Sequence, residues 1–375
     1  MSDADWTHVD RELRTQLFDT VLGRGRKFPK VWLVQHIDFP SIQNECRLQI
    51  KQYHNGPCGA VASIQAWFLK SLMFGKMGKL PHELSEKSKL LLLRKRGLIE
   101  ALSGILFHVT PLRKGPVRLI VPFPSGEAYN EDQYYESWHY TTLSTLDEVR
   151  AAVDAHFENI CHYGMVPFVC SLILSRGIVR VHTEAAKDTL VDPFQEDCFQ
   201  TLVNLILTGR AVSHVFDAPQ FCTEEHHPKY SRYGIVSRSI IGFMTSVELH
   251  NRTIVVGNHY KVPYHPIWVI HGESHYSVLF CQNRQVLQHM PTNDTFQWYT
   301  VTSFRGILLN KQFTLTIDST GPVTSRAPKM EQSVRVVREC VGLRWPCSQV
   351  GLDDIQHTYN AALTDESESE SENMS

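Results

Sequence analysis

The chain has 375 residues, of which 42% are hydrophobic and 20% charged, ordinary values for a globular protein of one large domain or two smaller ones. Its 37 basic and 39 acidic residues leave a net charge of −2, so the charge balance gives no reason to expect nucleic acid or a membrane surface as a partner. No apolar run approaches the roughly 18 residues of a membrane-spanning helix, and the acidic start of the chain lacks the apolar core of a signal peptide.

The nine cysteines are scattered along the chain, and no two of them form a C-x-x-C pair. Without a secretion signal we expect reduced thiols, and therefore a protein of the cytoplasm, the nucleus or both. The 19 histidines include no group with the spacing of zinc ligands. We therefore expect neither a metal nor another cofactor.

Composition divides the chain into three parts. Residues 1–30 are polar and become basic, and we interpret them as an N-terminal arm that frays, braces the core or covers a cleft, with a short helix over 10–22 as one option. Residues 31–360 then form one domain. Residues 361–375 are rich in Ser and Glu and lack apolar anchors, so they are expected to be disordered. The serines among acidic residues suit an acid-directed kinase, and a purely solubilising tail explains them equally well.

Apolar residues at helical spacing predict several helices. These are residues 58–72, one or two helices within 81–106, and 145–160, 200–209 and 334–344. The strongly apolar segment 166–175 fits a buried helix or a buried strand, and the polar, Tyr-rich segment 125–138 is expected to be a loop. The tripeptide Thr208-Gly209-Arg210 is equally consistent with a helix stop and with a loop that faces substrate.

Strands are predicted where β-branched and aromatic residues cluster between turn signals. The predicted strands are 117–122, 296–301, 306–309 and 313–317, together with a hairpin over 266–280. The hairpin turns at Gly272-Glu273-Ser274, and His275 opens its second strand.

The most informative stretch is Gln52-Tyr-His-Asn-Gly-Pro-Cys58-Gly59, immediately before and at the start of the first long helix. A thiol at a helix N-terminus faces unpaired N–H groups and the positive end of the helix dipole, both of which favour the nucleophilic thiolate. Gly56 and Gly59 expose bare backbone that would let a substrate chain approach. A buried structural thiol is the usual state of a free cysteine, but the turn, the helix and the upstream glutamine together favour a nucleophile.

Cysteine hydrolysis also needs a base and an oxyanion donor. His275 is the strongest base candidate because it follows a tight turn and opens an apolar strand; His271 is second. His54 lies too close to Cys58 in the sequence for the required side-chain geometry. The amide of Gln52, six residues before Cys58, is placed to donate to an oxyanion in the same pocket.

Four motifs resemble one enzyme family, in the right order over roughly residues 30–345. They are Gln52-x5-Cys58 with its Asn-Gly-Pro-Cys-Gly turn, Asn204-Leu-Ile-Leu-Thr-Gly-Arg-Ala-Val-Ser-His-Val-Phe-Asp217, Ile241-Gly-Phe243, and Pro266-Ile-Trp-Val with Glu273-Ser-His-Tyr-Ser-Val-Leu-Phe280. This set resembles the MINDY deubiquitinases, in the branch of the third and fourth human members.

The resemblance implies an α+β, papain-like cysteine protease fold with a central antiparallel β-sheet and the nucleophile at a helix N-terminus. It implies hydrolysis of the isopeptide bond between ubiquitin and lysine in polyubiquitin, with preference for the linkage that marks proteins for the proteasome, cut from chain ends. Ubiquitin and polyubiquitin are the implied partners. By the same likeness Cys58 is the nucleophile, His275 the general base and acid, and Gln52 the oxyanion donor.

The sequence also departs from the family pattern. The strand after the catalytic histidine ends in Asp-Gly in this branch, whereas here the run is Trp298-Tyr-Thr-Val-Thr-Ser-Phe304. The group that orients His275 is therefore open, with Asp318, Asn293 and Asp294 as candidates. Neither the long N-terminal extension of the fourth-member type nor the calcium-binding insert of the third-member type is recognisable.

Three functions follow from these observations. The first is an active ubiquitin-specific cysteine isopeptidase, for which Gln52, Cys58 and His275 are all present. The second is a weak or inactive pseudoenzyme that binds ubiquitin, consistent with the altered strand after Phe296. The third is a related cysteine transferase or amidase that acts on another substrate.

Overall fold

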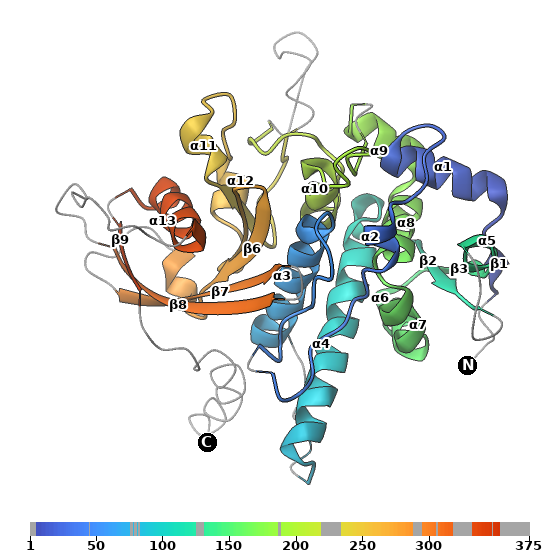
Figure 1. Cartoon of the computed structure of the whole chain (residues 1–375), viewed down its shortest axis with the longest axis horizontal. Coiled ribbons are helices and arrows are strands. Elements are labelled where there is room, and N and C mark those ends of the chain that lie inside the picture. Colours follow the sequence, from blue (N-terminus) through green and yellow to red (C-terminus); the bar gives the residue numbers. More distant parts are fainter. Residues whose placement is uncertain are drawn as a thin grey trace.

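The computed structural model describes residues 5–44, 46–75, 78, 81, 83–124, 131–186, 189–218, 234–287, 295–304, 307–317, 332–346 and 348–352. Side chains are described up to residue 287 and again over 335–346. In Figure 1 a long curved sheet occupies one end of the molecule and helices occupy the other, with α3 (Cys58–Phe74) between them.

The larger sheet has six strands in the order β4-β5-β6-β7-β8-β9. Their bounds are Gly242–Thr245, Ile267–Gly272, His275–Phe280, Thr295–Phe304, Ile307–Ile317 and Ser348–Leu352. The pair β4–β5 is parallel, and the other four neighbouring pairs are antiparallel. Glu273 and Ser274 turn the β5–β6 hairpin with positive φ angles of 53° and 61°, as a tight two-residue hairpin turn requires.

A second sheet of three strands, in the order β1-β3-β2, lies at the helical end. Its strands are Thr7–His8, Trp138–Leu143 and Val117–Pro122, all paired antiparallel. The architecture is therefore α+β.

The helices that accompany α3 differ widely in length. Those of seven residues or more are α1 (Arg11–Leu22), α4 (Glu86–His108), α6 (Leu146–Ala155), α7 (Phe157–Tyr163), α8 (Met165–Arg176), α9 (Ile178–Glu184), α10 (Gln200–Thr208) and α13 (Gln332–Arg344). The shorter ones are α2 (Lys30–Leu33), η1 (Pro111–Arg113), α5 (Glu131–Glu136), α11 (Val247–His250), α12 (Asn258–Lys261) and η3 (Arg284–Leu287).

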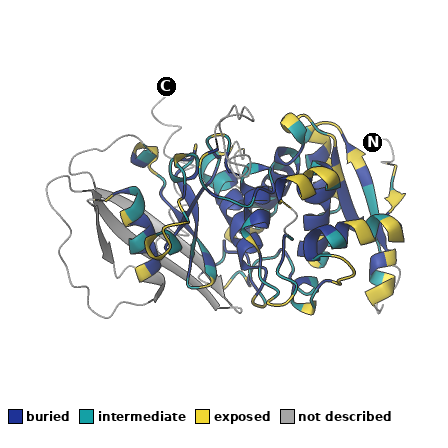
Figure 2. Ribbon diagram, turned by 90° about the horizontal axis from the view of Figure 1, so that it is seen from above, coloured by how far each residue is buried: buried dark blue, intermediate teal, exposed yellow. Residues whose placement is uncertain are grey.

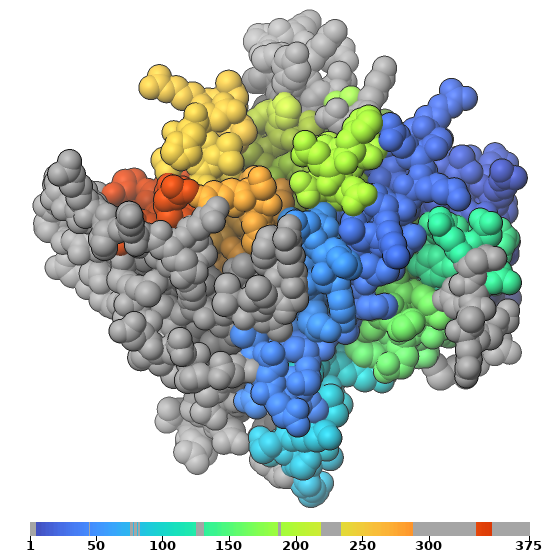
Figure 3. Space-filling model, in the orientation of Figure 1, coloured from blue at the N-terminus to red at the C-terminus, as the bar shows by residue number. Residues whose placement is uncertain are grey.

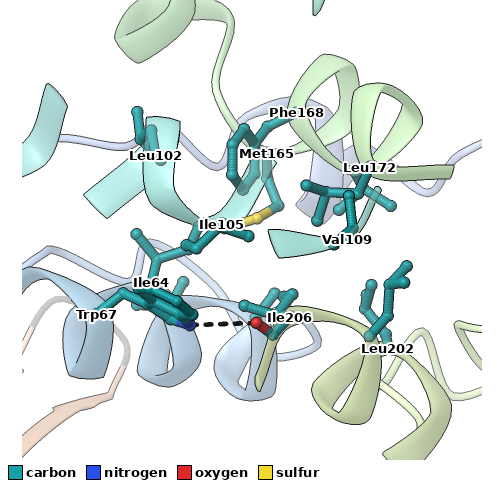
Figure 4. Packing of buried hydrophobic residues seen from close by; sticks show 14 of the residues in the cluster. Ile64, Trp67, Leu102, Ile105, Val109, Met165, Phe168, Leu172, Leu202 and Ile206 are labelled. Carbon is teal, nitrogen blue, oxygen red and sulfur yellow. Dashed lines mark hydrogen bonds between the residues drawn. The ribbon is translucent and has the colours of Figure 1, made fainter. Parts of the chain in front are cut away.

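The main core lies where α3, α4, α8 and α10 meet (Figure 4). Ile64 and Trp67 of α3 contribute to a layer shared with side chains of the other three helices, and the indole N–H of Trp67 donates to the carbonyl of Ile206 at 3.1 Å. This bond satisfies the one polar group of a buried tryptophan. Figure 2 shows the result, a continuous buried interior through α3 and its neighbours with exposed residues on the outer helices.

A smaller core lies on the other face of the large sheet. There α13 covers β4, β5 and β6 with Val336, Val337 and Cys340, packed against Trp268 and Leu279. Strand alternation separates the two cores, because Val269 and Val278 point to the α3 side while Trp268 and Leu279 point to the α13 side.

Most expected elements are confirmed, with informative differences. The helix at Cys58, the strand 117–122 and the hairpin have the predicted positions, and the apolar segment 166–175 is the buried helix α8. The expected helix 145–160 is two helices, α6 and α7, broken at His156. The two strands expected over 306–309 and 313–317 are one, β8, and the expected loop 125–138 contains the short helix α5.

The motif at residues 204–217 stabilises the fold through buried hydrogen bonds. Asn204 is fully buried and donates from Nδ2 to the carbonyls of Val212 and His214, while its Oδ1 accepts from the Tyr260 hydroxyl at 2.6 Å. Gly209 ends α10 in the left-handed conformation, with φ 78°. The tripeptide at 208–210 is therefore a helix stop, one of its two predicted roles.

Within the described residues no single helix is long and apolar enough to cross a membrane; α7 and α8 meet that criterion only as a pair bent by 107°.

Candidate active site

The segment that leads into α3 is held on both sides by buried glutamines. Gln65 of α3 accepts from the N–H of Ile50 at 2.7 Å and donates to the carbonyl of Leu48 at 3.2 Å. Gln35 donates to the carbonyl of Lys51 at 2.8 Å and accepts from the N–H of Tyr53 at 3.0 Å. The peptide groups on either side of Gln52 are thus clamped, which fixes where the Gln52 side chain starts. Neither clamp was predicted, because the sequence offers no local signal for it.

The turn before Cys58 packs against residues 196–198. Gly56 has a φ of 109°, and its carbonyl accepts from the N–H of Cys198 at 3.0 Å. A Cβ at Gly59 would lie 2.9 Å from the Val203 side chain and 3.0 Å from the Cys198 sulfur. The two glycines therefore allow close packing of the protein's own chain, and the approach of a substrate chain along them stays a prediction.

Cys58 is the first residue of α3, as predicted, and is 6% exposed. Burial and then the charge of Asp197 raise the pKa of its thiol to about 12, while the N–H groups of Tyr276, Gly59 and Cys58 act in the opposite direction. The expected thiolate-stabilising effect of the helix start is therefore present but is outweighed by desolvation. In this conformation the thiol is protonated at neutral pH.

The β5–β6 hairpin brings its second strand to the sulfur. The backbone N–H of Tyr276 lies close enough to Cys58 to favour the thiolate, and His275 is the preceding residue. Tyr276 and Val278 line a small cavity with Cys58, and His275 is not among the residues on that cavity. In Figure 3 the hairpin (orange), the chain around the start of α3 (blue) and the segment before α10 (yellow-green) adjoin on one face.

The second base candidate, His271, is on β5 directly opposite Tyr276. Its ring lies 4.5 Å from the Tyr276 ring, and its Nδ1 is 3.2 Å from the Thr245 hydroxyl. Burial lowers the pKa of His271 to about 4, so this imidazole is neutral at physiological pH. His54 is exposed and does not line the cavity, and its carbonyl accepts a bond from Gln52.

Gln52 lines the same cavity as Cys58, so the structure brings these two predicted residues together. Its Nε2 donates to the His54 carbonyl at 2.8 Å, which uses one of the two amide hydrogens. Gln49 also lines this cavity and is 1% exposed, and neither its amide nitrogen nor its amide oxygen has a hydrogen-bond partner in the described structure. A buried amide without partners is costly, so Gln49 is an unexpected feature of the site.

Two further residues near the sulfur were missed in the sequence. Asp197 raises the pKa of Cys58 by its charge, and burial raises the pKa of the Asp197 carboxyl itself. Cys198 is buried beside Gly59, and burial followed by the charge of Cys58 raises the pKa of its thiol. Their contact with Cys58 depends on a 140-residue return of the chain, which no local pattern reveals.

The three candidates for orienting His275, Asn293, Asp294 and Asp318, lie outside the described residues. Among the residues with described side chains, no cluster of three or more His, Cys, Asp or Glu could hold a metal ion. The residues that meet around the sulfur are therefore a thiol, a carboxamide, a carboxylate and the start of a histidine-led strand. A thiol at a helix start beside a carboxamide supplies two of the groups used in cysteine-dependent acyl transfer, and the base is not on the cavity in this conformation.

Comparison with known proteins agrees with this class of site. The conserved-domain family described as "Deubiquitinating enzyme MINDY-3/4, conserved domain" matches residues 14–354. The chain therefore belongs to the MINDY-3/4 deubiquitinase family.

Among curated relatives, the probable ubiquitin carboxyl-terminal hydrolase MINDY-4 of Xenopus tropicalis is 31% identical over 283 residues, covering 72% of this chain and 36% of the relative. Human MINDY-4, likewise named as probable, is 28% identical over 358 residues, covering 90% of this chain and 45% of its own. The ubiquitin carboxyl-terminal hydrolase MINDY-3 of Danio rerio is 28% identical, covering 62% and 57% respectively. The chain thus spans about a third to just over half of these relatives. No solved structure matches significantly.

Proposed function

We propose that this protein is a cysteine-type deubiquitinase that hydrolyses isopeptide bonds in polyubiquitin. The observation that carries the proposal is the meeting of Cys58 at the start of α3, Gln52 on the same cavity and the backbone N–H of Tyr276 in β6 at the sulfur. Family membership supports ubiquitin as the substrate class. We further propose a papain-like catalytic arrangement and a preference for proteasome-targeting chains.

In the proposed reaction His275 removes the proton from Cys58, and the thiolate attacks the carbonyl carbon of the last ubiquitin residue. The oxyanion that forms accepts hydrogen bonds from the side-chain amide of Gln52 and from the N–H of Cys58. The imidazolium returns its proton to the lysine amine, which leaves. Water, activated by the same imidazole, then hydrolyses the thioester and releases ubiquitin with a free carboxylate.

The buried sulfur adds a requirement to this sequence of steps. Because Cys58 is closed off and protonated, substrate must open the site before the thiolate can form. We propose that binding of ubiquitin separates the lead-in segment from strand β6 and moves the His275 imidazole to the sulfur. Substrate binding and activation of the nucleophile are then one event.

The alternative is a ubiquitin-binding pseudoenzyme, and one observation favours it. A thiol whose pKa is raised to about 12, with the candidate base off its cavity, is unreactive as it stands. The deubiquitinase and the pseudoenzyme differ in whether ubiquitin binding makes the Cys58 thiol reactive.

A ubiquitin probe with a thiol-reactive C-terminus distinguishes them, used with wild type and with Cys58→Ala. Labelling of wild type at Cys58 alone supports the deubiquitinase, and binding without labelling supports the pseudoenzyme. Cleavage of a panel of defined-linkage chains then tests the linkage preference. Residual cleavage by Cys58→Ala above background would refute Cys58 as the nucleophile.

A further inference from the structure

A second concave site lies away from Cys58, where α8, α9 and the chain after α10 meet strand β2. Its volume is about 810 Å³, within the range of ligand pockets. Four arginines from these separate segments line it, Arg118, Arg176, Arg180 and Arg210, and the lining contains one carboxylate, Glu184. The cavity is therefore strongly basic in a protein whose overall charge is close to zero.

The single carboxylate is fully used by the fold. Glu184 is 7% exposed and pairs with the Arg176 guanidinium through both of its oxygens. It also accepts from Arg210 Nε at 3.3 Å and from the backbone N–H of Ala211 at 3.0 Å. These donors hold the end of α9 against the chain after α10, and among the described side chains Glu184 forms no ion pair with Arg118 or Arg180.

The other three guanidinium groups keep N–H donors that no described residue uses. Arg118 and Arg180 are exposed and form no ion pair within the described residues, and Arg210 uses only its Nε on Glu184. Arg118 has a single marginal contact, 3.5 Å from Nη1 to the carbonyl of Leu174. Guanidinium groups with unused N–H donors around one hollow favour binding of an anion between them. Val179, 80% exposed, supplies an apolar rim.

We propose that this arginine-lined cavity binds the acidic C-terminal run of the chain itself, residues 365–372. That run reads Asp-Glu-Ser-Glu-Ser-Glu-Ser-Glu, with Leu363 two residues before it, so it offers closely spaced carboxylates after one apolar side chain. Carboxylates suit the forked geometry of guanidinium donors, and phosphorylation of the intervening serines adds stronger acceptors. The run lies outside the described residues, and the inference depends on its chemistry alone.

The test is fluorescence anisotropy with a labelled peptide of residues 361–375. The titrant is the full-length protein with its own run neutralised by Asp365→Asn, Glu366→Gln, Glu368→Gln, Glu370→Gln and Glu372→Gln. We expect saturable binding that weakens at least about fivefold between about 0.05 and about 0.5 M NaCl, because exposed charges are screened. The same peptide phosphorylated on Ser367, Ser369 and Ser371 should bind at least about threefold more tightly.

A matched pair of double variants locates the site. Arg118→Gln with Arg180→Gln should weaken binding about tenfold, since two charge-assisted contacts are lost. Arg11→Gln with Arg252→Gln removes the same charge from exposed positions elsewhere and should change affinity less than about twofold. Neither pair touches a buried ion pair, so both variants should fold, which thermal unfolding verifies.

Three results would overturn the proposal. One is equal loss of affinity in the two double variants, which would indicate non-specific attraction. The second is equal competition by an RNA oligonucleotide of the same charge, which would indicate a general polyanion site. The third is equal affinity of the peptide for proteins with the native and the neutralised run, because a run that occupies the cavity in its own chain must compete with the peptide.

Discussion

The backbone N–H of Tyr276 lies beside the sulfur of Cys58, so the start of strand β6 and the start of helix α3 meet at one atom. The two residues are 218 positions apart, and β6 packs along α3 to bring them together. This contact places the strand that begins with His275 next to α3. It also helps to bury the sulfur that His275 would activate.

Cys58 should react slowly with iodoacetamide in the free protein. Burial and Asp197 raise its pKa to about 12, so the thiolate fraction, and with it the rate, should rise about tenfold per pH unit in the neutral to alkaline range. Asp197→Asn removes the adverse charge and should accelerate alkylation about three- to tenfold. Site-resolved mass spectrometry measures the rate. Glu196→Gln, the same charge change one residue earlier, is the control, and an equal acceleration there would contradict the role of Asp197.

Gln52→Ala should lower turnover of a ubiquitin substrate about 10²- to 10³-fold, because an oxyanion donor acts mainly in the transition state. The Michaelis constant should change much less. Steady-state kinetics on a fluorogenic ubiquitin substrate separates the two parameters. A loss below about threefold in turnover would mean that backbone N–H groups alone stabilise the oxyanion.

Gln49→Met should leave the free energy of unfolding unchanged or raise it, because the amide it removes is buried without hydrogen-bond partners. Gln65→Met is the matched control on the same cavity. It breaks the bonds to Ile50 and Leu48 and should cost about 1–3 kcal/mol. Urea unfolding of both variants measures the difference, and equal destabilisation would show that the Gln49 amide is satisfied in solution.

Gly59→Ala should destabilise the fold by about 1–3 kcal/mol, since the new methyl group would press on Val203 and the Cys198 sulfur. Gly342→Ala in α13 is the control, because nothing lies within 4 Å of the added carbon. That variant should be stabilised by about 0.5–1 kcal/mol through the intrinsic helix preference for alanine. Unfolding of the two variants side by side gives the comparison; a stabilised Gly59→Ala would contradict the close packing seen here.

Stability should fall as the pH is lowered below about 6.5, and His108 should contribute to the slope. Burial lowers the pKa of His108 to about 3. Below about pH 6.5 this histidine therefore binds a proton in the unfolded chain but stays neutral in the folded protein. One such histidine makes the free energy of unfolding fall by about 1.4 kcal/mol per pH unit below its unfolded pKa. His108→Gln should reduce the loss between pH 6 and pH 5 by about that amount. Urea unfolding at the two pH values tests it, and an unchanged slope would show that His108 is already protonated in the fold.

The elements around the site were predictable where the local sequence specifies the secondary structure. The apolar spacing after Pro57 specifies α3, and Gly272-Glu273-Ser274 specifies the hairpin, because turn chemistry and side-chain period act over a few residues. The same reasoning failed at 145–160, where His156 interrupts a continuous amphipathic pattern, and it missed β3, whose residues pair with β2 across an intervening segment. Those outcomes depend on packing partners distant in sequence.

The sequence identified residues of the candidate site, but it did not reveal their burial or their protonation state. The sequence by itself determined that a cysteine begins a helix, that a glutamine stands six residues before it and that a histidine opens a strand, since each is a local pattern. Only the tertiary structure decided that Cys198, Asp197 and Tyr276 close around the sulfur, that desolvation outweighs the helix start in setting the Cys58 pKa, and that four arginines from separate segments share one cavity. The physical reason is that burial and charge act through space, and the spatial neighbours of a side chain come from parts of the chain that its own sequence surroundings do not specify.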